Sequence, residues 1–129
     1  MKLIHPDKVA ARAIRYLRAL EYVLNAEAIV LSDYREGDPK EHGKGNAIDT
    51  TWIDVDPLKV VEVTLDLNLW GGFGLYINEG GYVSFHHDIR PHKANGSIAT
   101  WYGQITNPGG KKHIEYLAFH LGIDRIKAK

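Results

Sequence analysis

Apolar residues recur at three- and four-residue steps near the N-terminus, which predicts an amphipathic helix. This helix is expected to run from about Pro6, a residue suited to a first turn, to Leu24. Its apolar positions are Val9, Ala13, Ile14, Leu17, Leu20 and Leu24. Lysine and arginine occupy much of the other side, so the helix is expected to pack on a core. The next apolar run, residues 28–31, is rich in β-branched residues and predicts a buried strand.

The middle of the chain alternates between loop, strand and helix signals. Residues 36–46 are rich in glycine and polar residues and predict a loop. Residues 47–53 favour an extended strand because they are rich in isoleucine and threonine. A second helix is expected to begin at Pro57 with Asp56 as its N-cap. Its apolar side is expected to carry Leu58, Val61, Leu65 and Leu69.

The second half of the chain predicts a hairpin and a last helix. Residues 73–77 and 82–89 have the pattern of two strands joined by a tight turn. Residues 91–110 are expected to be irregular, and a final helix is expected over about 112–121. Together these elements predict one α+β domain spanning residues 1–129, with a small antiparallel sheet and flanking helices.

Composition narrows the classes of function. With 129 residues, 44% of them hydrophobic, the chain can bury one core of ordinary size. The 16 basic and 16 acidic residues cancel, so there is no basic excess for binding a phosphate backbone and no nucleic-acid partner is expected. The absence of cysteine excludes disulfides, thiolate metal sites and cysteine nucleophiles. The composition also includes seven histidines and 13 glycines, and these residues mark the candidate sites described below.

Neither membrane insertion nor a secretory signal is expected from the sequence. Its apolar runs are all shorter than the roughly 20 residues that span a bilayer, so stable membrane insertion is not expected. Arg12, Arg15 and Arg18 interrupt any signal-peptide core. We therefore expect the protein to be made in the cytoplasm without a signal peptide, and to stay there unless another system exports it.

A first candidate metal-binding segment lies at residues 42–49, which read His-Gly-Lys-Gly-Asn-Ala-Ile-Asp. Gly43 and Gly45 permit positive φ angles, so the loop can fold back and bring the imidazole of His42 toward the carboxylate of Asp49. Both groups are good zinc ligands. The segment therefore predicts two ligands of one site.

A second candidate segment follows in the expected hairpin. Alternate residues of a strand share a face, so His86 and Asp88 point one way and His87 the other. If this strand lies beside the one that carries Asp49, His86 completes a site with three protein ligands. Such a site leaves the fourth zinc position open for water, which is the catalytic arrangement.

With the upstream segment Ser32-Asp33-Tyr34-Arg35, these motifs resemble the zinc peptidases of the M15 family. This is the D-Ala-D-Ala carboxypeptidase and peptidoglycan endopeptidase group, which has the hedgehog/DD-peptidase fold. The family carries Ser-x-Tyr-Arg at a strand end, then His-x-x-Gly-x-Ala-x-Asp, then a hairpin ending in His-x-Asp. The chain matches these motifs in order over roughly residues 28–90.

The resemblance implies that zinc is bound by His42, Asp49 and His86, with His87 as the third ligand instead if the strand register differs by one. It also implies that Arg35 helps to hold a substrate carboxylate or carbonyl. The implied activity is hydrolysis of a peptide bond in bacterial peptidoglycan stem peptides, by a carboxypeptidase or an endopeptidase. The single domain fits a phage endolysin that needs a pore-forming partner to reach the cell wall.

The chain departs from the family at the general base. Many members have an acid three residues before the last zinc histidine, where this chain has Val83, or Ser84 if His87 is the ligand. The first-ranked replacement is Asp88, and Glu79, His87 and His92 are the others. Asp88 has a competing role, which is to orient a zinc histidine. The missing acid also leaves open a catalytically inactive zinc-containing binding or structural module of the same fold, and a metal-free domain is a third interpretation.

Arg35 and the aromatic pair Trp101 and Tyr102 each have an alternative role. Arg35 can instead form a salt bridge with Asp33, Glu36 or Asp38. Trp101 and Tyr102 either form a wall of a substrate groove for a peptide or a sugar, beside Arg90, or attach the irregular segment to the core.

Overall fold

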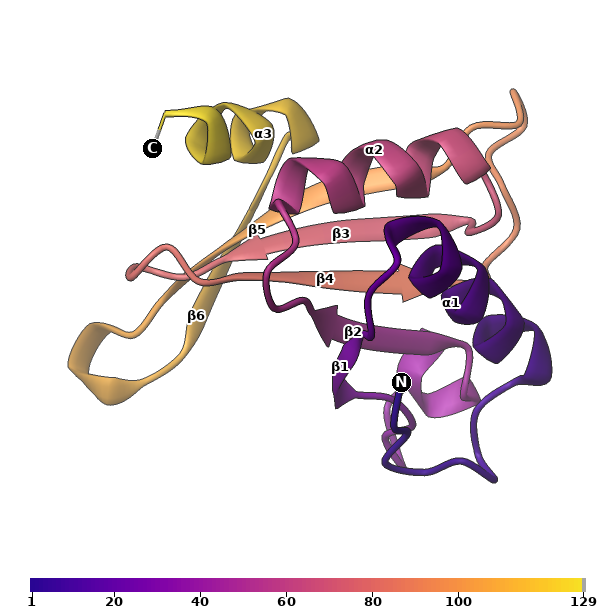
Figure 1. Cartoon of the computed structure of the whole chain (residues 1–129). Coiled ribbons are helices and arrows are strands. Elements are labelled where there is room, and N and C mark those ends of the chain that lie inside the picture. Colours follow the sequence, from indigo (N-terminus) through magenta and orange to yellow (C-terminus); the bar gives the residue numbers. More distant parts are fainter. Residues whose placement is uncertain (129) are drawn as a thin grey trace.

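A mixed sheet of six strands forms the middle of residues 1–128, the part of the chain that the structure, a computed structural model, describes (Figure 1). The strand order is β1-β2-β4-β3-β5-β6. The strands are β1 (Ile29–Ser32), β2 (Ala47–Thr51), β3 (Gly72–Ile77), β4 (Val83–Asp88), β5 (Ala99–Thr106) and β6 (His113–Leu117). The helices are α1 (Ala11–Leu24), α2 (Pro57–Leu67) and α3 (Phe119–Lys127), with short 3₁₀ turns η1 (Glu41–Lys44) and η2 (Pro108–Gly110).

The two faces of the sheet carry different chemistry. The core lies between one face and the helices, and its buried strand residues are Ile48, Phe73, Leu75, Ile77, Phe85 and Tyr102. Residues paired across neighbouring strands share a face, and one such row on the opposite side consists of Asp49, His86, Gly74 and Trp101. We call the side that carries this row the open face. The candidate ligands Asp49 and His86 therefore lie on the side of the sheet away from the core.

The predicted α+β class is confirmed, but the predicted antiparallel sheet is wrong in one pairing. β5 runs parallel to β3, from Gly72 opposite Ala99 to Ile77 opposite Gln104. After β4 the chain crosses the end of the sheet and enters β5 beside the start of β3, where the Ala99 amide bonds to the Gly71 carbonyl at 2.9 Å. The hairpin of β3 and β4 is antiparallel as predicted.

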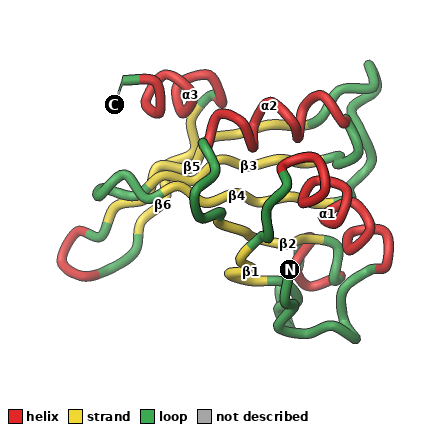
Figure 2. The backbone as a smooth tube through the Cα atoms, in the orientation of Figure 1, coloured by secondary structure: helices red, strands yellow, loops and turns green. Residues whose placement is uncertain are grey.

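The C-terminal part differs most from the prediction. Residues 99–106, expected to be irregular, form β5, and much of the expected helix 112–121 is β6 (Figure 2). Residues 113–117 become a strand because β5 offers them a full antiparallel partner. Gly122 lies inside α3 instead of ending a helix, because a Cβ there would be 2.8 Å from the side chains of both Leu75 and Tyr102. The glycine lets α3 approach the sheet closely.

The helices of the first half follow the prediction more closely. α1 buries Ala13, Leu17 and Leu20 as predicted, although it begins at Ala11 and not at Pro6. Asp56 caps α2 by accepting from the Leu58 amide at 2.9 Å, and Pro57 is its first residue. The predicted apolar side of α2 is wrong in part, since its buried residues are Val60, Val61, Val63 and Thr64. No helix within residues 1–128 has both the length and the apolar character to cross a bilayer.

The strand predicted at residues 28–31 is not buried. Within residues 1–128, β1 lies at the edge of the sheet and has β2 as its one neighbouring strand. Its side chains alternate between partly exposed and exposed, with Ile29 at 39% and Leu31 at 44%. The apolar run marks an edge strand because half of its side chains point away from the core.

Candidate metal centre

Three side chains from three segments converge on the open face. His42 comes from η1, Asp49 from β2 and His86 from β4. His42 Nε2 lies 3.1 Å from Asp49 Oδ1 and 3.2 Å from His86 Nδ1, and His86 Nδ1 lies 2.9 Å from Asp49 Oδ1. A tetrahedral zinc ion with bonds of about 2.0–2.1 Å separates its ligand atoms by about 3.3 Å. The three atoms therefore form a triangle close to the size that one zinc ion requires.

Each imidazole has an inner nitrogen that faces the cluster and an outer nitrogen that faces away from it. Both outer nitrogens already form hydrogen bonds. His42 Nδ1 donates to the backbone oxygen of Asp33 at 2.5 Å, and His86 Nε2 donates to Asp88 Oδ2 at 2.7 Å. A carbonyl and a carboxylate only accept, so both outer nitrogens carry the hydrogen. In neutral imidazoles the inner nitrogens then present lone pairs to each other and to Asp49. Such a cluster needs a shared proton or a cation, and this donor set suits a divalent metal such as zinc.

Two glycines place His42. Gly43 is needed for close approach, because a Cβ there would lie 1.7 Å from the backbone oxygen of Asp38. Gly45 has φ +72 and packs on the backbone of Lys8, whose carbonyl oxygen would lie 2.0 Å from an added Cβ. The predicted positive φ is therefore confirmed at Gly45, whereas Gly43 serves for packing.

The buried carboxylate of Asp33 anchors this loop to the N-terminal segment. It accepts hydrogen bonds from the amides of Ile4, His5 and Tyr34, at 2.6 to 2.9 Å, and contacts His5 Nδ1 at 2.7 Å. Burial opposes its ionisation, but these hydrogen bonds outweigh burial and lower the pKa of Asp33. Because the Asp33 carbonyl holds His42, the N-terminal segment helps to position a candidate ligand. The sequence pattern offered no signal for this role, since His5 and Asp33 are 28 residues apart.

Asp88 is fully occupied by its neighbours. Its Oδ1 accepts from the backbone amide and Nε of Arg90, at 3.1 and 2.8 Å. Its Oδ2 accepts from Arg90 Nη2 and His86 Nε2, both at 2.7 Å. Burial would raise the pKa of Asp88, but the hydrogen bonds from His86 and Arg90 hold it well below its usual range. A buried carboxylate with four donors is arranged to orient His86, which favours that role over proton transfer.

His87 lies on the opposite side of the sheet from the candidate metal centre. Its ring packs in the core against Phe73 and Trp70, with centroids 4.7 and 5.0 Å apart, and its Nε2 lies 3.0 Å from Thr64 Oγ1. Burial lowers the pKa of His87 to about 3, so the ring is neutral. The alternation predicted for this strand is therefore confirmed, and the geometry favours His86 over His87 as the ligand.

The other proposed bases have partners elsewhere. Glu79 accepts from the Asn107 amide at 2.7 Å, near the tips of the two hairpins. His92 Nε2 bonds to the carbonyl of Asn68, the C-cap of α2, at 3.1 Å. Among the described residues, no hydrogen bond or ion pair joins either side chain to the three candidate ligands.

Arg35 lies at the rim of the centre. Its Nη2 donates to Asp49 Oδ2 at 2.9 Å, and its Nη1 lies 3.4 Å from Asp38 Oδ2. The alternative salt bridge with Asp38 is thus present, together with one to a candidate ligand. The side chain remains 48% exposed, so a guanidinium edge is accessible to an incoming carboxylate or carbonyl.

Of the two aromatic residues predicted beside a groove, only Trp101 faces the centre. Its ring lies 5.4 Å from that of His86 on the open face. Tyr102 points into the core, where its hydroxyl accepts from Arg125 Nη1 at 3.0 Å. The strand alternation of β5 separates the two rings.

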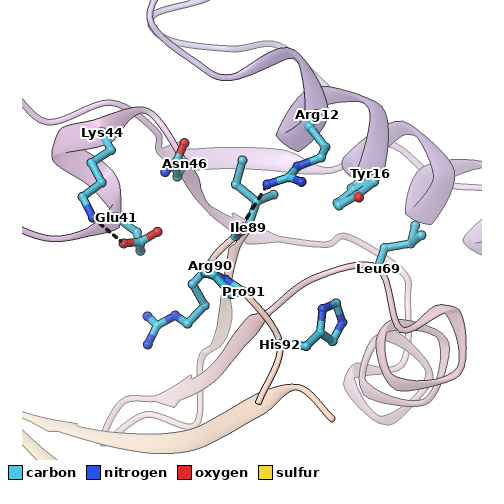
Figure 3. Close-up of a pocket in the computed structure, with 10 residues that line it drawn as sticks. All are labelled: Arg12, Tyr16, Glu41, Lys44, Asn46, Leu69, Ile89, Arg90, Pro91 and His92. Carbon is cyan, nitrogen blue, oxygen red and sulfur yellow. Dashed lines mark hydrogen bonds and ion pairs between the residues drawn. The ribbon is translucent and has the colours of Figure 1, made fainter. Parts of the chain in front are cut away.

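A cavity of about 460 Å³ adjoins the centre at the ends of β2 and β4 (Figure 3). Figure 3 shows Arg12 from α1 and the Lys44–Glu41 pair of η1 on its walls, with Arg90 at one side. None of the three candidate ligands lines it. Three cationic side chains and one carboxylate line it, and two of the cations are paired, Lys44 with Glu41 and Arg90 with Asp88.

No family model, curated protein or solved structure matches the chain. The chemistry of the centre is therefore inferred from its own residues. Those residues supply two imidazoles and one carboxylate directed at a common point, an accessible guanidinium and a cation-lined cavity nearby.

We expect zinc to stabilise the protein more strongly as pH rises from about 5 to about 8. In the metal-free protein, burial opposes the imidazolium of His86, but hydrogen bonds to Asp49 and Asp88 outweigh it and raise the pKa of His86. A raised folded-state pKa contributes stability that is fully present below the unfolded value of about 6.5 and is lost as pH rises through the folded value. Zinc needs deprotonated imidazoles and so has the opposite dependence.

The measurement is the difference in Tm between zinc-loaded and chelator-treated protein at a series of pH values. Magnesium, which prefers oxygen ligands, is the control and is expected to give no such difference. A zinc effect that stays constant or shrinks as pH rises would contradict this interpretation of the centre.

Proposed function

We propose that the protein is a zinc-dependent hydrolase that cuts a peptide bond in bacterial peptidoglycan stem peptides, as its resemblance to M15 peptidases implies. One observation carries the proposal. The inner nitrogens of His42 and His86 and the carboxylate of Asp49 meet within 3.2 Å, while the outer nitrogens donate to fixed acceptors. Three protein ligands leave a coordination position for water or substrate, as catalytic zinc sites require.

Zinc, when bound, would polarise the scissile carbonyl and lower the pKa of a water molecule toward 7, from about 16. The protein residues orient the two imidazoles and keep the carboxylate ligand ionised. Asp88 and the Asp33 carbonyl fix the hydrogens of the imidazoles on their outer nitrogens, so the lone pairs point inward. In the metal-free protein, burial would raise the pKa of Asp49, but its interactions with His42 and His86 keep the pKa well below the usual range, so the carboxylate is already ionised before a metal binds.

Substrate recognition is assigned to positive groups around the centre. Arg35 is placed to bind a substrate carboxylate or carbonyl with its exposed guanidinium edge. Stem peptides carry several carboxylates, so the cavity beside η1, with Arg12 on its wall, is assigned as a second contact for the same peptide. Action on the cell wall requires passage across the membrane, for which a pore-forming partner of the phage-lysis type is proposed.

A catalytically inactive zinc-containing module of the same fold is the second candidate. The specific observation in its favour is the lack of a free acidic base. Val83 occupies the position where many M15 peptidases have an acid, and all four acceptor positions of Asp88 are filled. Such a module would keep the metal as a structural element and bind the wall without turnover.

Mass spectrometry of muropeptides tests the proposed activity. Purified peptidoglycan incubated with zinc-loaded protein is expected to yield shortened stem peptides, whose masses identify the bond that is cut. A chelator is expected to stop the reaction and added zinc to restore it. Unchanged muropeptides with a stoichiometric zinc content, at every pH assayed, would reject the hydrolase and favour the inactive module.

A further inference from the structure

Tyr76 lies on the open face next to the metal centre. In the pairing of β3 with β4, Gly74 stands opposite His86, and in the pairing of β3 with β5 it stands beside Trp101. Tyr76 is two residues beyond Gly74 in β3, so it points to the same face.

Two glycines, Gly74 in β3 and Gly103 in β5, make room for the phenol ring on the open face. A Cβ added at Gly74 would lie 2.9 Å from Tyr76 Cε2 and 2.5 Å from Trp101 Nε1. A Cβ at Gly103 would lie 2.5 Å from Tyr76 Cδ1 and Cε1. The ring thus occupies space above residues that have no side chain, one of which is the direct strand partner of His86.

The hydroxyl of Tyr76 is held in place by Trp101. The indole Nε1 donates to Tyr76 Oη at 2.8 Å. Trp101 is in turn packed against the guanidinium of Arg90, 4.9 Å from the ring centroid, and against His86. Arg90 is also bonded to Asp88, which orients His86. The Arg90–Asp88 pair therefore supports both the indole of Trp101 and the imidazole of His86. The phenol oxygen is therefore fixed relative to the candidate ligand.

This arrangement leaves the phenol hydrogen directed away from Trp101. An indole N–H can only donate, so Tyr76 Oη is the acceptor in that bond and its own hydrogen points elsewhere. Burial raises the pKa of Tyr76, and the neighbouring phenol of Tyr116, whose ring centroid lies 6.4 Å away, and the charge of Asp49 add to the effect, while the hydrogen bond from Trp101 opposes it. The group is thus a neutral donor at ordinary pH, within electrostatic reach of a metal ligand.

We propose that Tyr76 is a further catalytic residue, which donates a hydrogen bond to the carbonyl oxygen of the bond being cut. The proposal rests on the proposed hydrolase function. When the water oxygen bonds to the carbonyl carbon, the π pair of the carbonyl moves onto its oxygen, and Tyr76 stabilises that negative charge. The C–N bond then breaks, the pair returns to the carbonyl, and the leaving nitrogen takes a proton from the water. Tyr76 keeps its own proton throughout.

Replacing the phenol by a phenyl ring tests the role directly. Tyr76→Phe keeps the ring over Gly74 and is expected to lower kcat by about 100-fold, the loss typical of one oxyanion donor. KM for muropeptides and zinc content are expected to stay near wild type. Tyr22→Phe, which removes a phenol from an exposed position of α1, is the matched control and is expected to be unchanged. A wild-type kcat for Tyr76→Phe would overturn the proposal.

A second measurement needs no turnover. A phosphinate analogue of D-Ala-D-Ala mimics the charged intermediate, and its Kd for zinc-loaded protein is measured by calorimetry. Tyr76→Phe is expected to bind it about 10- to 100-fold more weakly, the value of one hydrogen bond to a charged group. Unchanged phosphinate affinity would overturn the proposal even if kcat fell, since the phenol would then act on structure alone.

These readouts separate the two proposals. If wild type cuts no muropeptide but binds the phosphinate through Tyr76, the hydrolase function fails, and Tyr76 is a hydrogen-bond donor to the bound ligand but not a catalytic residue. If wild type takes up no zinc, both fail. Should Tyr76→Phe not fold, Trp101→Phe takes its place, because it keeps the phenol but removes the group that fixes it. This variant is expected to lose part of the phosphinate affinity, and full affinity would contradict the proposal.

Discussion

His42→Ala and Asp49→Asn are each expected to abolish stoichiometric zinc binding and peptidoglycan hydrolysis. Either change removes one of three ligands, so zinc affinity should fall by more than the roughly 10- to 100-fold that follows loss of an outer hydrogen-bond partner. Asp49→Asn nearly preserves the side-chain shape while removing the negative charge that faces both imidazoles. The expected loss of function is therefore a loss of coordination and not of packing.

Zinc per chain is measured by elemental mass spectrometry after dialysis, and hydrolysis by muropeptide analysis. His120→Ala is the matched control, because His120 is exposed on α3 and far in sequence from the three ligand segments. Wild-type zinc content in His42→Ala would show that the cluster is not the metal site. Zinc loss with undiminished hydrolysis would separate the metal from the activity.

Asp88→Ala is expected to weaken zinc binding by about 10- to 100-fold. The variant frees the ring of His86 and leaves Arg90 without its carboxylate, so the inner nitrogen is no longer aimed at the common point. Loss of these charge-assisted hydrogen bonds is also expected to lower the free energy of unfolding by about 2–3 kcal/mol. A general base would behave differently, because its removal lowers kcat while zinc affinity is retained.

Competition titrations with a chelator give the zinc affinity, and kcat is measured at saturating zinc. Glu79→Gln, at the hairpin tip, is the control for loss of a carboxylate and is expected to match wild type in both. If Asp88→Ala binds zinc as tightly as wild type but has lost turnover, Asp88 is the base after all, and the orienting role inferred from its four hydrogen bonds is wrong.

Local signals were sufficient where neighbouring residues determine the structure. Asp56 and Pro57 predicted the start of α2 because cap and first-turn preferences act within one turn of helix. Strand alternation in β4 placed His86 and His87 on opposite faces because the side-chain period of a strand is two. The spacing of residues 42–49 likewise brought His42 close to Asp49.

Local signals failed where distant segments compete for the same residues. Residues 113–117 have no strong preference of their own, and the free edge of β5 made them a strand. The parallel pairing of β3 with β5 depends on where the chain returns after β4. The roles of Asp33 and Tyr76 could not be predicted from the sequence either, because their partners His5 and Trp101 lie 28 and 25 residues away.

The residue types of the centre and the alternation that sorts them onto one face follow from the sequence alone, because both depend on spacings of a few residues. Tertiary structure decided which atoms meet, which acceptors orient the imidazoles, and that Asp88 is saturated while a phenol lies beside the cluster. These are distances between segments far apart in the chain, and they arise only when the sheet assembles and packs.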